Sequence, residues 1–181
     1  TELFSESYEP NWEEDLSYED SVNQFEEGTY KFFARSVEGG WQKGCADLSR
    51  EIPCAPDEDS LSPSEETVAV NGEEDCGIEL EWQHVTNTLV PDGAEADCAG
   101  PPIDVETYQV IIENLDTETE FSIFLEAEEG INSVTIPEEF VEDGITYKWE
   151  VLAIAENGNQ TIAETYFCTG TQGAPCPEPE D

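Results

Sequence analysis

Residues 140–153 read FVEDGITYKWEVLA, with apolar side chains at every second position of the second half: Tyr147, Trp149, Val151 and Ala153. Side chains two apart on a strand share one face of a sheet, so this alternation predicts a half-buried β-strand with two large aromatics on its inner face. Asn157-Gly158-Asn159 supplies a turn, and 161–167 is expected as the returning strand.

The same period of two recurs upstream, where Ile78, Leu80 and Trp82 alternate with polar residues. The expected strands are 67–70, 78–83, 108–113, 120–126, 133–136, 147–155 and 161–168. Their length and the Gly, Pro and Asn residues between them predict an all-β, antiparallel fold, since helical periodicity is essentially absent. The expected core residues are Trp82, Tyr108, Tyr147, Trp149 and Val151.

Residues 67–168 resemble a fibronectin type III domain, which is an immunoglobulin-like β-sandwich. Trp82 sits where that family places its buried strand-B tryptophan, and 140–153 looks like the E–F corner running into strand F. Tyr147 matches the tyrosine-corner position, whose hydroxyl bonds to upstream backbone. The likeness is in the style of tandem modules of exported bacterial proteins of unassigned role. It covers over half of the chain and implies a fold without a specific ligand.

A β-hairpin is expected over 28–55, as the remnant or extension of a sandwich, with its turn at Gly39-Gly40. It resembles the final hairpin of a similar upstream module. The hairpin holds four of the five basic residues, namely Lys31, Arg35, Lys43 and Arg50. On an otherwise acidic chain these residues indicate either a docking surface for an acidic segment or local charge balance within the hairpin.

The remaining segments are polar in composition. Residues 1–27 hold ten acids and no base, yet carry several large apolar groups, so this arm is expected to lie on its own body or on a neighbour, with a short helix running to about Gln24. Residues 56–66 are expected as a linker or a strand-to-strand crossing, and 169–181 as a Pro/Gly-rich tail. The expected anchors of the arm are Leu3, Phe4, Tyr8 and Trp12.

The formal charge of −40 over 181 residues argues against two classes of binding partner, nucleic acids and anionic membranes. Nucleic acid and anionic membrane faces attract positive surfaces, so neither is expected to bind, and no apolar run is long enough for a membrane helix. A surface this acidic suits a saline or calcium-rich exterior, where counterions screen its self-repulsion.

Six cysteines without any CxxC favour disulfides over zinc, and disulfides predict an extracellular or cell-surface location. Proximity along the chain favours three local pairs, although 15 pairings are formally open. Those pairs are Cys45–Cys54, Cys76–Cys98 and Cys168–Cys176.

No catalytic site is expected, because the single histidine, His84, has no nucleophile motif beside it. Asn159-Gln160-Thr161 is the one glycosylation sequon. No cofactor is expected, but acidic loops offer oxygen ligands for Ca²⁺, against the simpler interpretation of diffuse counterions. The candidate calcium ligands are Asp57, Glu58, Asp59, Asp92, Glu95, Asp97, Asp116 and Glu118.

Two functions follow, both non-enzymatic. The first is an extracellular structural subunit of a surface fibre or filament, assembled with copies of itself or neighbouring sandwich modules through strand or arm exchange. The second is a calcium-stabilised spacer or ligand-binding adhesion module of a larger exported protein. Self-association in solution discriminates between them.

Overall fold

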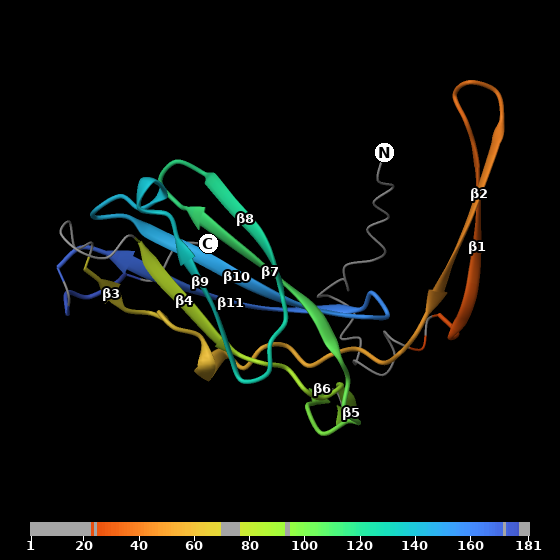
Figure 1. Cartoon of the computed structure of the whole chain (residues 1–181), viewed down its shortest axis with the longest axis horizontal. Coiled ribbons are helices and arrows are strands. Elements are labelled where there is room, and N and C mark those ends of the chain that lie inside the picture. Colours follow the sequence, from red (N-terminus) through yellow and green to blue (C-terminus); the bar gives the residue numbers. More distant parts are fainter. Residues whose placement is uncertain (1–22, 24, 70–76, 93–94, 172, 178–181) are drawn as a thin grey trace.

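The computed structural model describes residues 23, 25–69, 77–92, 95–171 and 173–177, and over these ranges the chain is all-β without an α-helix, which confirms the expected class (Figure 1). The strands are β1 Gly28–Arg35, β2 Trp41–Leu48, β3 Thr67–Val68, β4 Ile78–Gln83, β5 Val90–Asp92, β6 Glu95–Asp97, β7 Val105–Asn114, β8 Thr119–Glu126, β9 Ile131–Ile136, β10 Thr146–Ala155 and β11 Gln160–Thr169. Two short 3₁₀ turns complete the described elements, η1 Glu58–Ser60 and η2 Glu138–Phe140.

One five-stranded sheet forms the body, in the order β3-β11-β10-β7-β8. Its pairs are antiparallel except for β3 with β11, and the sheet curls as a half-barrel. The antiparallel ribbon β4-β9 covers the concave side. Two smaller ribbons, β1-β2 and β5-β6, complete the set of sheets.

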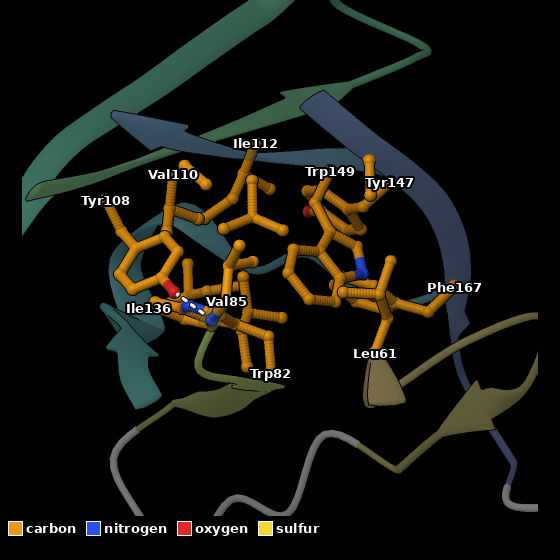
Figure 2. Packing of buried hydrophobic residues seen from close by; sticks show 14 of the residues in the cluster. Leu61, Trp82, Val85, Tyr108, Val110, Ile112, Ile136, Tyr147, Trp149 and Phe167 are labelled. Atoms are coloured by element: carbon orange, nitrogen blue, oxygen red, sulfur yellow. Dashed lines mark hydrogen bonds between the residues drawn. The ribbon is translucent and has the colours of Figure 1, made fainter. Parts of the chain in front are cut away.

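The core lies between the five-stranded sheet and the β4-β9 ribbon (Figure 2). Along β10 burial alternates with the pleat, as expected for a strand with one face in the core. Trp82 of β4 meets Tyr108 of β7 edge to face, with ring centroids 5.4 Å apart. Side chains of this size each contribute about 1.5–3 kcal/mol when fully buried. The five residues expected in the core are all fully buried: Trp82, Tyr108, Tyr147, Trp149 and Val151.

The hydroxyl of Tyr147 ties β10 to the segment that precedes it. It donates to the Phe140 carbonyl at 3.1 Å and accepts the Glu142 N–H at 2.8 Å. Burial raises the pKa of Tyr147 above its ordinary value, although the Glu142 N–H acts in the opposite direction. The contact spans the corner between η2 and β10, so it fixes where β10 begins.

Replacing Tyr147 with Phe is expected to lower the free energy of unfolding by about 1–3 kcal/mol, because the partly buried Glu142 N–H and Phe140 carbonyl lose their shared partner. Urea unfolding measures the change. Tyr30→Phe is the matched control, since the Tyr30 hydroxyl donates to the Glu26 carbonyl at an exposed position and its loss should cost less than about 0.5 kcal/mol. Equal costs for the two variants would contradict the structural role of Tyr147.

Residues 56–66, expected as a linker or a crossing, pack on the body. Leu61 is buried, Ser62 forms an antiparallel bridge with Glu81, and the Trp149 indole N–H donates to the Pro63 carbonyl at 3.0 Å. The hydrogen bond satisfies a buried indole that would otherwise lose its partner on folding. The segment therefore closes one edge of the β4-β9 layer.

Two cysteine pairs lie at disulfide distance. One of them was expected from proximity along the chain, and the other differs from the expected pairing. Cys168 pairs with Cys176, whereas Cys54 pairs with Cys98, so the expected Cys45–Cys54 and Cys76–Cys98 pairs are wrong. The exposed Cys45 is a free thiol on the β1-β2 ribbon, and Cys76 lies outside the described residues.

Backbone contacts explain the Cys54–Cys98 pair. The Cys54 N–H donates to the Asn87 carbonyl at 2.9 Å, and the Gly100 N–H donates to the Thr88 carbonyl at 3.0 Å. The chain before Cys54 and the chain after Cys98 therefore flank the same stretch. The two cysteine Cα atoms come within 5.6 Å across 44 positions of sequence.

Candidate functional site

The β1-β2 hairpin projects from the body as a separate ribbon (Figure 1). Every residue of β2 is exposed, and Tyr30 alone on β1 is half-buried. A two-stranded hairpin is marginally stable by itself in water, because it has no sheet or helix on which to bury a face. Within the described part of the chain, this ribbon therefore buries neither of its faces.

The base of the hairpin is held by the β10-β11 turn. Asn159 Nδ2 donates to the carbonyls of Ser49 and Glu51 at 2.8 and 3.0 Å, and Asn157 Nδ2 donates to the Glu51 carbonyl at 2.8 Å. The Arg50 guanidinium also donates to the Phe25 carbonyl at 3.0 Å. These bonds anchor residues 49–51, which we call the neck of the hairpin, and no other described element covers either face of the ribbon.

The antiparallel register gives the hairpin two chemically different faces. Residues opposite one another share a face, as do residues two apart. The uncharged face carries Gly28, Tyr30, Phe32, Ala34, Gln42, Gly44, Ala46 and Leu48. The other, which we call the cationic face, carries Thr29, Lys31, Phe33, Arg35, Trp41, Lys43, Cys45 and Asp47.

The cationic face combines exposed aromatics with unpaired charges. Phe33 is 66% exposed and Trp41 is 75% exposed, and the register places them diagonally, within reach of one another. Both ion pairs of the described residues belong to Lys148, and within this part of the chain Lys31, Arg35 and Lys43 form none. Ion pairing inside the hairpin therefore does not balance its charges.

The expected glycosylation sequon, Asn159-Gln160-Thr161, makes structural contacts. The amide nitrogen of Asn159 is occupied by its two hydrogen bonds to the neck, and the Thr161 hydroxyl donates to the Cys54 carbonyl at 2.7 Å. A glycan on that nitrogen would have to displace at least one of these bonds. The sequon therefore serves the packing of the hairpin base. The arm anchors Leu3, Phe4, Tyr8 and Trp12 lie outside the described residues.

The acidic loops give no metal cluster among the described residues. The Asp57 carboxylate accepts the Asp59 N–H at 3.1 Å and so caps η1. Asp92 and Glu95 fall on the β5-β6 ribbon with Asp97, and Asp116 and Glu118 fall in the β7-β8 turn. In that turn the Asn114 carboxamide oxygen accepts the Asp116 N–H at 3.0 Å.

His84 lies beside a shallow pocket of about 440 Å³ whose lining includes the Cys54–Cys98 pair. The Tyr108 hydroxyl accepts the Val85 N–H at 2.8 Å and lies 3.1 Å from His84 Nδ1. Burial raises the pKa of Tyr108 above its ordinary value, so this hydroxyl stays protonated and can donate to the imidazole. The histidine thus completes a hydrogen-bond chain at the end of β4. In the described lining both cysteines are oxidised, so no thiol nucleophile stands beside it.

The sequence predicted the hairpin and its basic residues, but it did not predict that Trp41 lies on the cationic face beside them. Its place on the cationic face depends on the pairing of Arg35 with Trp41, which follows from the length of the turn between them. The Gly39-Gly40 pair marks that turn in the sequence and is the signal from which the register could have been derived.

The chain shows no helix among its described residues that is long and apolar enough to cross a membrane. Its two cysteine pairs are typical of an oxidising compartment. No protein-family model matches the chain, and no curated protein matches it.

Proposed function

We propose that this chain is a non-enzymatic structural subunit of an extracellular fibre or filament, and that it assembles by docking its β1-β2 hairpin on a neighbouring copy. The observation that carries the proposal is the exposure of large aromatics on an isolated two-stranded ribbon. Such side chains gain most from burial in a partner, and Trp and Arg, both present on this ribbon, are enriched among the residues that dominate binding energy at protein interfaces.

Charge supports a copy of the same chain as the partner. The molecule carries −40 overall, while three of its five basic residues lie on one face of the hairpin and form no ion pair with the described residues. A cationic face of this kind is attracted by the acidic surface that every other copy presents, and this complementarity favours encounter and register.

Strand order supports an immunoglobulin-like sandwich of the fibronectin type III kind as the fold of the body. In this proposal the ribbon β4-β9 corresponds to strands B and E, and the neighbouring strands β7, β10 and β11 of the larger sheet correspond to strands C, F and G. The Tyr147 hydroxyl makes the backbone contacts of a tyrosine corner. Modules of this fold are common in extracellular structural proteins, and the cysteine pairs support the same location.

The proposal is tested by sedimentation velocity in seawater-like salt with Phe32, Phe33 and Trp41 together replaced by Ser. We expect the wild type to form multimers and the triple variant to associate at least 100-fold more weakly, because truncation of one buried aromatic anchor alone costs about 2 kcal/mol or more. Ile131→Ser is the matched control, since Ile131 is 70% exposed on β9 but lies off the hairpin.

Near-UV circular dichroism verifies that each variant keeps the folded core. A wild-type chain that stays monomeric at high concentration, with and without calcium, would overturn the proposal and favour the spacer or adhesion module. Equal association of the triple variant and the wild type would overturn the role of the hairpin.

A further inference from the structure

The outer face of the five-stranded sheet lacks a covering layer among the described elements (Figure 1). The β4-β9 ribbon packs on the inner face, where the alternate residues of β10 are buried. The intervening residues point outward on all the long strands, because successive side chains alternate between the two faces. The body therefore presents a second, broad surface that the core does not use.

A row of mainly apolar residues, which we call the apolar row, crosses this outer face. The strand registers place Phe124 of β8, Gln109 of β7, Leu152 of β10 and Ile162 of β11 side by side. Phe124 is 63% exposed and Ile162 is 47% exposed, although both lie on regular strands of a packed sheet. Large apolar side chains that line up on one exposed face are typical of interaction surfaces.

Glutamates frame the apolar row. The adjacent row contains Ser122 of β8, Ile111 of β7, Glu150 of β10 and Glu164 of β11. Two carboxylates therefore lie directly beside Leu152 and Ile162. The one basic residue on the face, Lys148, is held between them, with its Nζ 3.1 Å from Glu150 and 2.8 Å from Glu164. The other outward acids of the long strands are Glu113, Glu120 and Glu126.

The cationic face of the hairpin has the complementary composition. It pairs Phe33 with Lys43 and Arg35 with Trp41, so aromatic and basic side chains alternate over two rows. Rows on the hairpin and on the sheet are built from the same strand spacing of about 4.8 Å. Aromatic groups can therefore lie on the apolar row while the basic groups reach the glutamates beside it.

We propose that the outer face of the five-stranded sheet receives the cationic face of a neighbouring copy's hairpin. The acidic arm at 1–27 has ten acids and no base, so its charge has the wrong sign for a surface framed by glutamates. The hairpin of the same chain projects away from the body, with its neck fixed by Asn157 and Asn159 (Figure 1). A second copy is the occupant that fits.

This contact joins two different surfaces, a hairpin on one copy and a sheet face on the next. Each bound copy then offers its own free hairpin or free sheet face to another. Heterologous contacts of this type form rings when the rotation closes and open filaments when it does not. The inference rests on the proposed assembly function and specifies how that assembly propagates.

Two variants test the inference, and each has substitutions that disable one of the two surfaces, the cationic face of the hairpin or the outer face of the sheet. The hairpin variant carries Lys31→Glu, Arg35→Glu and Lys43→Glu, and the sheet variant carries Phe124→Ser, Glu150→Lys and Glu164→Lys. We expect each alone to be monomeric, with association at least 100-fold weaker than in the wild type. Mixed, they should form particles of two chains and no larger, because only the sheet variant's hairpin and the hairpin variant's sheet remain functional.

A control variant, Glu138→Lys with Glu139→Lys, adds the same positive charge on η2, which belongs to neither surface, and should assemble as the wild type does. Phe124→Ser alone provides a milder sheet variant if the triple change unfolds the chain, and should still weaken association about 10-fold. A sheet variant that assembles normally while the hairpin variant is monomeric would overturn the acceptor face and leave the hairpin's role intact. Wild-type monomers would overturn both.

Discussion

Removing the Cys54–Cys98 disulfide, by Cys54→Ala with Cys98→Ala, is expected to lower the free energy of unfolding by about 4 kcal/mol. The pair closes a loop of 44 positions, and the chain entropy that a cross-link removes from the unfolded state grows with loop length. Buried Cys54 adds to the cost when its side chain is shortened. Urea unfolding under non-reducing conditions measures the change.

The second disulfide is the matched control. Cys168 and Cys176 are separated by only 8 positions, so their double Ala variant should lose about 2.5 kcal/mol by the same relation. A Cys54–Cys98 variant that loses no more stability than this control would contradict the assignment. So would a non-reducing peptide map that links Cys54 to Cys45.

Gly77→Ala is expected to lower the free energy of unfolding by about 2–6 kcal/mol, through two effects that act together. Gly77 has φ of +116°, a conformation in which a side chain costs about 1–3 kcal/mol. A Cβ there would also lie 1.9 Å from the Ile136 carbonyl oxygen, so the end of β9 must move away from β4. Such overpacking adds about 1–3 kcal/mol.

Gly130→Ala separates the two effects. Gly130 has φ of +96°, but a Cβ built there meets no atom within 4 Å. Its cost should be limited to the backbone term of about 1–3 kcal/mol. Thermal or urea unfolding of both variants compares them, and equal losses would contradict the close approach of β4 and β9 at Gly77.

The strands of the body could be predicted from the sequence where one face is buried and the other polar. Tyr147, Trp149 and Val151 alternate with Lys148 and Glu150, and this period of two leaves little choice of element or of face. The hairpin could be predicted equally well, because alternating aromatic residues precede the Gly39-Gly40 turn. In both cases the signal is local, and the structure adds only the partner strand.

The disulfide pairing and the outer face depend on contacts that are distant in sequence. Cys54 meets Cys98 only because residues 52–54 run beside 87–89, which no local pattern records. On β8, Ile123 and Phe124 are adjacent apolar residues, so periodicity does not say which one faces the core. Pairing with Val110 and Gln109 decides it, and leaves Phe124 exposed.

Segment 56–66 illustrates a further limit of composition. Proline and serine are as common in linkers as in irregular segments that pack on a sheet. Leu61 is the one large apolar residue within this stretch, and its burial draws the segment onto the core. A single buried side chain is too weak a pattern to distinguish the two interpretations beforehand.

Assembly of this chain with copies of itself is the property on which the proposed function depends. Light scattering of the unmodified, unreduced protein in seawater-like salt, over a wide range of concentration, tests it most directly. We expect a mass that rises with concentration to many times that of one chain. A mass that stays at a single chain throughout the range would contradict it.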